Sequence, residues 1–218
     1  MPVQKPGDKA IYNQTGYVPL GIIIEKVSGI GFEEFVNRRL LRPLEMIRTM
    51  YGDPRDIVAG RASMYSAYEP SVDRIRFLMR DHDLVFSPDH RYTSGTFVFP
   101  RFMFTGVGLN SNIVDMTKWE LALLSGRVMK PETLDEAAKP FKLNDGKSGE
   151  WGLGWDVGSR NGHRYMEING GDAVEHLRFL DDRLCIIMLT NLQGSHPDEL
   201  AMGVAELYLP GLKSQPKK

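Results

Sequence analysis

Tyr12, Asn13 and Gln14 form the first stretch of this sequence whose side chains could serve chemistry. "YNQ" places a phenol and two carboxamides immediately before an apolar pattern of helical spacing. The structural alternative is equally simple: asparagine and threonine are favoured helix caps, and Asn13 or Thr15 would fill that place. The stretch alone leaves both interpretations open.

A second polar stretch is "NGG" at residues 169–171, between two apolar strand-like segments. Asn-Gly and Gly-Gly pairs are typical of hairpin turns, because these residues accept a positive φ at little cost. A turn or bulge between two strands is therefore the structural interpretation, and an active-site loop is the functional one.

The five histidines and the single cysteine do not predict a metal site. "DHD" at 81–83 and "DH" at 89–90 offer oxygen and imidazole ligands, but no two histidines have the i, i+4 spacing of a metalloprotease helix. Cys185 lies in the apolar run "LCIIMLT", which predicts a buried, inert thiol. "GVGLNS" at 106–111 lacks the third glycine of a dinucleotide-binding loop. We therefore expect no metal and no cofactor.

A nucleophilic serine in a known motif is missing from the sequence. It contains no G-x-S-x-G elbow, and its one Ser-x-x-Lys match is "SQPK" at 214–217. That chemistry needs the serine at the start of a buried helix with the lysine one turn later. Because Pro216 separates the two in a charged tail, we interpret the match as accidental.

The composition is that of a globular protein with one domain or at most two small ones. The chain has 218 residues, 42% of them hydrophobic, and a net charge of -1, which gives no electrostatic attraction to nucleic acid. No apolar run approaches the roughly 20 residues that span a bilayer, and "MPVQKPGDKA" has no hydrophobic signal region. We expect neither a nucleic-acid partner nor a membrane segment, and the compartment stays open.

The first two thirds of the chain predict helices and a long irregular region. The apolar spacing indicates a helix that stops near Gly29, a second in "FEEFVNRRLL" ended by Pro43, and a third capped by Asn112. Residues 52–110 predict loops with one short helix near 72–79. The apolar faces of the three helices are Leu20, Ile23, Ile24 and Val27; Phe32, Phe35, Val36 and Leu40; and Met116, Trp119 and Leu123.

The last third predicts an antiparallel sheet and a covering helix. "WGLGWDV", "HRYMEI", "VEHLRFL" and "LCIIMLT" are the expected strands, and the last is apolar on both faces, which predicts a central strand covered on both sides. A helix from about Pro197 to Leu207 should face the sheet with Leu200, Val204 and Leu207. The fold class is therefore α+β.

These segments together resemble the serine β-lactamase and penicillin-binding protein superfamily, in its class C β-lactamase, D,D-carboxypeptidase and esterase branch. The resemblance lies in "KPGDKAIYNQTGYVPLG" at the Tyr-x-Asn motif, in "GVGLNSNIVDMTKWELALLSG", and in "WGLGW" and "NGGDAVEHLRFLDDRLCIIMLTN". It implies an incomplete β-lactamase-like domain: residues 1–218 as its C-terminal part, with a helical and irregular lobe at about 12–130 and strands plus the final helix at about 150–210.

The resemblance also implies roles for the two polar stretches. In this superfamily a serine on a Ser-x-x-Lys helix is acylated by a peptide, lactam or ester carbonyl, and the Tyr-x-Asn element moves the proton and orients the amide. Tyr12 would be the proton-transfer residue, with Gln14 where the family has asparagine. The residues that would belong to the substrate-binding strand are Asn169, Gly170 and Gly171.

This strand departs from the family's Lys/His-x-Gly pattern. Depending on the register, Ile168 or Asn169 stands where the family has a cation or histidine. Without that group, recognition of a substrate carboxylate is weakened, and with it recognition of β-lactams. An ester or amide substrate without a carboxylate can bind this site without that group.

Three functional hypotheses follow. In the family the Ser-x-x-Lys helix precedes the tyrosine motif, whereas eleven residues precede Tyr12 here. We therefore expect the C-terminal part of a serine hydrolase that acts on ester, amide or lactam carbonyls and is inactive alone. The alternatives are a non-catalytic relic that binds a ligand or partner, and an unrelated hydrolase or metal protein that uses the loop histidines. An incomplete domain exposes apolar surface, which predicts self-association.

Overall fold

The computed structural model describes residues 5–52, 56–69, 85–86, 89, 91–94, 100–171 and 173–213. The helices are α1 (Tyr17–Ser28), α2 (Phe32–Val36), α4 (Ile113–Leu124), α5 (Pro131–Ala137) and α6 (Pro197–Tyr208). Short helical turns are η1 (Gln14–Gly16), η2 (Asn37–Leu41), η3 (Arg101–Met103) and η4 (Pro210–Leu212). Among these described residues no helix has the length and apolar character needed to cross a membrane.

The described strands form three antiparallel sheets. The first pairs β1 (Met50–Tyr51) with β5 (Leu109–Asn110). The second has the order β2 (Tyr65–Ala67), β4 (Tyr92–Ser94), β3 (Val85–Phe86). The third and largest has the order β6 (Asp156–Arg160), β7 (His163–Gly170), β8 (Val174–Phe179), β9 (Leu184–Leu189). The predicted α+β fold is confirmed, as are the strands predicted in "HRYMEI", "VEHLRFL" and "LCIIMLT". The strand predicted in "WGLGWDV" is displaced: β6 begins at Asp156 and runs to Arg160, because Gly154, with φ +84°, interrupts the extended backbone before it.

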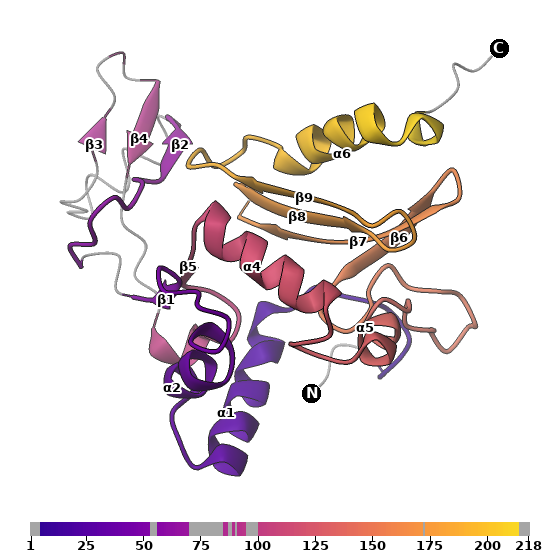
Figure 1. The fold of residues 1–218 in the computed structure, drawn as a ribbon, viewed down its shortest axis with the longest axis horizontal. Coiled ribbons are helices and arrows are strands. Elements are labelled where there is room, and N and C mark those ends of the chain that lie inside the picture. Colours follow the sequence, from indigo (N-terminus) through magenta and orange to yellow (C-terminus); the bar gives the residue numbers. More distant parts are fainter. Residues whose placement is uncertain are drawn as a thin grey trace.

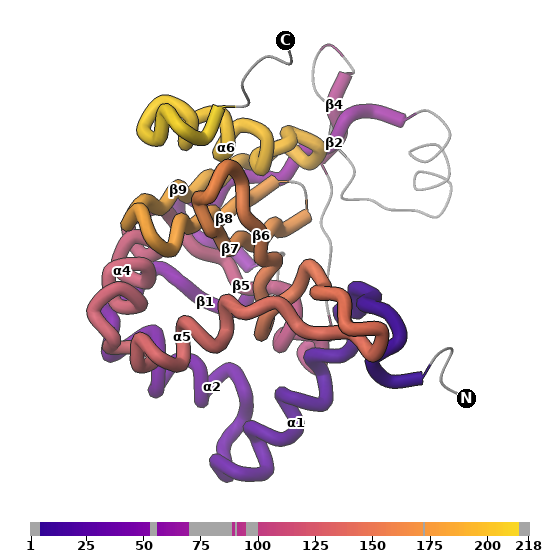
Figure 2. Tube along the Cα trace, turned by 90° about the vertical axis from the view of Figure 1, so that its right-hand side faces the viewer, coloured from indigo at the N-terminus to yellow at the C-terminus, as the bar shows by residue number. Residues whose placement is uncertain are grey.

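The four-stranded sheet is the centre of the architecture. Figure 1 shows α6 over one face and α4 across the other, with α1 and α2 beyond α4, and Figure 2 shows the same layers from the side. The core under α6 consists of Leu177, Phe179, Ala201, Ala205 and Leu212. The core on the α4 side consists of Leu123, Leu134 and Met166. The sheet thus separates two apolar layers, one closed by α6 and the other by α4 together with Leu134 of α5.

The prediction for the buried face of α6 is wrong. Ala201 and Ala205 are fully buried against the sheet, whereas Leu200 and Leu207 are 54% and 73% exposed. Small side chains let the helix axis approach the strands closely. This close packing determines which face of α6 is turned toward the sheet, although the leucine side chains are larger.

The prediction that "LCIIMLT" is a central strand is also wrong. β9 is the last strand in the described order of its sheet and pairs there with β8. Both α6 and α4 contact β9, one on each face. Its two-sided apolar character is therefore explained by coverage from two helices.

The predicted helix before Gly29 is confirmed, but its apolar stripe is largely exposed. Gly29 ends α1 with φ +73°, and its N–H donates to the Glu25 carbonyl at 2.9 Å. The buried residue of α1 is Gly21, where a Cβ would lie 2.1 Å from the Thr105 side chain. α1 therefore packs through its glycine. The exposed apolar residues include Leu20, Ile23 and Val27, at 52%, 55% and 84%.

The positions of the second and third predicted helices are confirmed. α2 continues into the π-type turn η2 and ends before Pro43, with Val36 and Leu41 in the core. Asn112 caps α4, and Gly126 follows it with φ +71°. The helix predicted near 72–79 and the "DHD" motif at 81–83 lie outside the described residues, as does His90.

Candidate active site

The segment that leads into α1 presents Tyr12 on an aromatic platform. The Tyr12 ring lies 5.6 Å from the ring of Trp151, at an angle of 33°. Its side chain is 65% exposed, so solvent and small molecules reach the phenol. The Asn13 side chain accepts a hydrogen bond from the Thr15 N–H at 3.1 Å, which confirms the predicted cap. Helix-start chemistry thus fixes the backbone beside an exposed tyrosine.

Gln14 fixes the same segment to a glycine loop. Its side-chain amide donates a long hydrogen bond, 3.4 Å, to the carbonyl of Gly106. A Cβ on Gly106 would lie 3.2 Å from the Gln14 side chain, so glycine permits this close approach. The "GVGLNS" glycine therefore positions the entry to α1.

The "NGG" stretch forms the turn between β7 and β8. Gly170 pairs with Val174, and its carbonyl accepts from the Ala173 N–H at 3.1 Å. A Cβ on Gly170 would lie 2.6 Å from the Val174 side chain, and Gly171 has φ +58°. Both glycines are therefore required by the turn, and the predicted hairpin is confirmed.

The two polar stretches are connected through the edge of the sheet. Trp151, whose ring packs against the Tyr12 ring, forms a β-bridge with Asp156 at the start of β6. Asp156 pairs with Glu167 of β7, two residues before Asn169. A continuous set of contacts thus runs from the phenol to the β7–β8 turn. The sequence places Trp151 in an expected strand and in the family resemblance, but it does not predict the contact with Tyr12.

A buried carboxyl group stands directly opposite Asn169. Glu175 is 1% exposed, and its burial raises its pKa to about 8, with a further contribution from Glu167. The Asn169 amide acts in the opposite direction and lowers the pKa. Glu175 therefore holds a proton at neutral pH beside the turn. Sequence reasoning missed this residue, because its burial depends on α6.

A second buried polar group lies on the other face of the sheet, under α4. Glu120 Oε2 is 3.0 Å from His176 Nε2, and Glu120 Oε1 is 3.5 Å from Arg178 Nε. Burial opposes ionisation of Glu120, but the His176 hydrogen bond and the Arg178 charge prevail and lower its pKa. Burial raises the pKa of the neighbouring Cys185 thiol, and the residue is half-buried where the sequence predicts a buried one.

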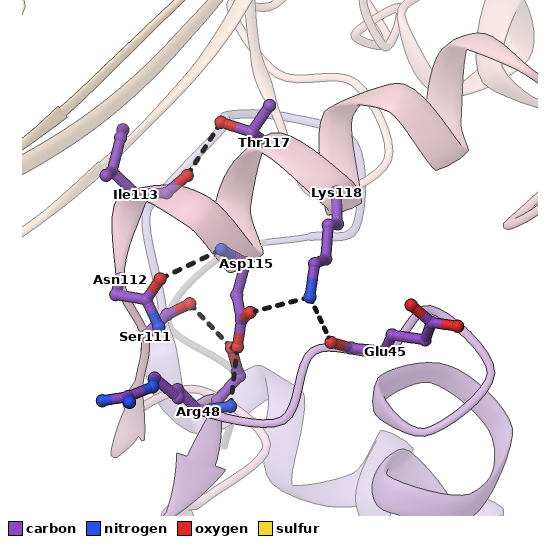
Figure 3. Close-up of polar contacts among 9 residues, drawn as sticks. Glu45, Arg48, Ser111, Asn112, Ile113, Asp115, Thr117 and Lys118 are labelled. Carbon is purple, nitrogen blue, oxygen red and sulfur yellow. Dashed lines mark hydrogen bonds and ion pairs between the residues drawn. The ribbon is translucent and has the colours of Figure 1, made fainter.

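The start of α4 is organised by Asp115, as Figure 3 shows. Asp115 is buried, and its Oδ2 accepts from the Arg48 N–H at 2.8 Å and the Thr49 hydroxyl at 2.9 Å. Lys118 lies 3.5 Å from its other oxygen and donates to the Glu45 carbonyl. Asp115 therefore ties the segment before β1 to α4, a structural role.

The Beta-lactamase family matches residues 1–208. This chain belongs to that family. Penicillin-binding protein 4* of Bacillus subtilis is 25% identical over 192 residues, which are 86% of this chain and 41% of the relative. The human mitochondrial serine beta-lactamase-like protein LACTB is 22% identical over 195 residues, 78% of this chain and 32% of the relative. The chain thus spans less than half the length of these relatives.

Solved structures share the fold. The octameric penicillin-binding protein homologue from Pyrococcus abyssi has a TM-score of 0.72 at 21% identity, covering 95% of this chain and 44% of its own. A D-stereospecific amidohydrolase from Streptomyces has a TM-score of 0.68 at 18% identity, covering 92% and 56%. These structures show the fold, and the family match over residues 1–208 confirms the resemblance to the serine β-lactamase and penicillin-binding protein superfamily.

Proposed function

We propose that this chain forms one wall of a serine hydrolase active site that works through an acyl-enzyme on ester, amide or lactam carbonyls. Membership of the Beta-lactamase family supports the reaction class. The observation that carries the proposal is the exposed Tyr12 phenol, held on Trp151 at the entry to α1. Tyr12 takes the proton of the attacking serine hydroxyl and returns it to the leaving group.

Gln14 and the β7–β8 turn border the substrate in this proposal. The Gln14 amide orients the carbonyl group of the substrate. The opposite edge of the active site is lined by Asn169, Gly170 and Gly171. Ile168 or Asn169 stands in the place of the family's cation, so the preferred substrate is an ester or amide without an anchoring carboxylate. The name of the Streptomyces amidohydrolase is compatible with amide substrates.

We further propose that the 218 residues alone do not form an acyl-enzyme. The only Ser-x-x-Lys in the sequence is 214–217, and its proline is incompatible with a helix that would place the lysine beside the serine. The chain then acts as the C-terminal part of a single domain, with lobes at about 12–130 and 150–210. A segment with the family's Ser-x-x-Lys helix supplies the nucleophile.

The proposal is tested with this chain joined behind such a Ser-x-x-Lys segment, using a nitrophenyl ester. Tyr12→Phe should lower kcat by about 10²- to 10⁴-fold, the range of general acid–base catalysis. Tyr208→Phe, an exposed tyrosine of α6, is the matched control and should leave kcat unchanged. Equal kcat values for Tyr12→Phe and the parent would exclude Tyr12 as the proton-transfer residue.

We also propose that the chain self-associates through the exposed stripe of α1. Three aliphatic side chains, Leu20, Ile23 and Val27, are each more than half exposed on this helix. The octameric state of the Pyrococcus homologue is compatible with assembly. In light scattering, Ile23→Asp combined with Val27→Asp should lower the molar mass toward that of one chain, 24.6 kDa. Leu207→Asp, at an exposed leucine of α6, is the control.

A further inference from the structure

Three potential metal ligands of different chemistry meet between α4 and the sheet. They are the Glu120 carboxylate from α4, the His176 imidazole from β8 and the Cys185 thiol from β9. One ligand atom of each lies within 4.8 Å of the other two. The elements that carry them are a packed helix and two paired strands, so the backbone holds the three groups in place.

The spacing approaches that of a bound divalent ion. With bonds of about 2.0–2.3 Å, ligand atoms around a tetrahedral metal lie roughly 3.3–3.8 Å apart. The Glu120 Oε2 to His176 Nε2 distance of 3.0 Å is slightly short of this, and the thiol closes the third side within 4.8 Å. The three groups therefore lie close enough for small side-chain adjustments to direct them at one ion.

Arg178 occupies the position of an outer-sphere partner. Its guanidinium lies 3.5 Å from Glu120 Oε1, the oxygen that does not face His176. A carboxylate that binds a metal through one oxygen is commonly held by a hydrogen bond on the other. Glu120 therefore keeps its ion pair through Oε1 while Oε2 faces the imidazole.

We infer that Glu120, His176 and Cys185 form a binding site for a divalent transition metal of the zinc type. The combination of thiolate, imidazole and carboxylate suits Zn²⁺ or Co²⁺ and not Mg²⁺ or Ca²⁺, which prefer oxygen ligands alone. On binding, two protons are displaced: the Cys185 S–H bond breaks and its proton leaves to solvent, and the Nε2 proton that His176 donates to Glu120 moves to solvent or to Nδ1. The sulfur and the nitrogen freed in this way form the metal bonds. This site departs from the sequence-based expectation of no metal, which considered only the loop histidines.

Co²⁺ is the direct probe, because a cobalt–thiolate bond gives an intense charge-transfer absorption. The 218-residue chain titrated with Co²⁺ should develop this band with saturation at one ion per chain, and excess Zn²⁺ should abolish it. Cys185→Ser should remove the band, and His176→Gln should weaken Co²⁺ binding at least tenfold. His163→Gln is the control, since His163 lies on the same sheet and contacts Asp182 at 2.9 Å. It should keep the band and the affinity.

A second measurement needs no variant. Cys185 is the only cysteine, so alkylation of the unmodified chain reports on one thiol. Zn²⁺ should slow alkylation at least tenfold, and a chelator should restore the rate. An unchanged alkylation rate, a cobalt spectrum without the thiolate band, or equal loss of binding in His163→Gln would each overturn the site. The proposed acyl transfer does not depend on this result.

Discussion

Replacement of Asp115 tests how the start of α4 is held. The carboxylate is buried and accepts two hydrogen bonds, from the Arg48 N–H at 2.8 Å and the Thr49 hydroxyl at 2.9 Å (Figure 3). In Asp115→Ala both donors lose their acceptor inside the protein. Hydrogen bonds to charged groups contribute about 1.5–3 kcal/mol each, so we expect a loss of about 3–6 kcal/mol in the free energy of unfolding.

Two further variants make this expectation quantitative. Asn112→Ala removes only the helix cap, whose side chain accepts from the Asp115 N–H at 3.1 Å, and should cost about 1 kcal/mol. Asp135→Ala, at an exposed position of α5, should stay within about 0.5 kcal/mol of the parent.

Urea unfolding followed by circular dichroism measures these differences, with the slope m checked for constancy. The expected order of destabilisation is Asp115→Ala, then Asn112→Ala, then Asp135→Ala. For a chain of this size the first change corresponds to a lower Tm on the order of 10 °C. If Asp115→Ala were as stable as Asp135→Ala, the buried carboxylate would not hold the segment before β1, and the reasoning would be refuted.

Two other changes probe the candidate site through stability. Gly170→Ala should lower the free energy of unfolding by about 1–3 kcal/mol, because its Cβ would lie 2.6 Å from the Val174 side chain. Gly203→Ala, in open space on α6, is the control and should be neutral or stabilising by up to about 1 kcal/mol in the same urea assay. Burial raises the pKa of Glu175 from 4.5 to about 8, so the stability that its neutral form contributes is complete below about pH 4.5 and is lost as the pH rises to 8. Glu175→Gln should flatten this decline between pH 5 and 8, and an unchanged slope would show that Glu175 is ionised in the folded protein.

Local signals in the sequence were sufficient for the end of α1, the start of α4 and the β7–β8 hairpin, but not for the start of β6. Asn112 begins α4 and Gly29 ends α1, each through contacts with residues a few positions away in the sequence. The hairpin at Gly170–Gly171 is local in the same sense. The family resemblance rests on such segments in order, which is why it was confirmed.

Long-range packing was not predictable from the same signals. α6 buries Ala201 instead of Leu200 because the distance between the helix and the sheet determines which side chains fit between them. The spacing of apolar residues along the sequence gives no information on that distance. The support of Tyr12 by Trp151 joins residues far apart in the sequence. Similarly, the approach of Cys185 to Glu120 depends on where α4 crosses β9.

The central claim is that this chain supplies the Tyr12 wall of an acyl-enzyme site but not its nucleophile. Intact-mass measurement after incubation with a fluorescent penicillin and with an activated ester tests it most directly. We expect no covalent adduct on the 218-residue chain with either reagent, and one adduct per chain from the activated ester when a Ser-x-x-Lys segment precedes it. A stoichiometric adduct on a serine of the 218-residue chain would contradict the account.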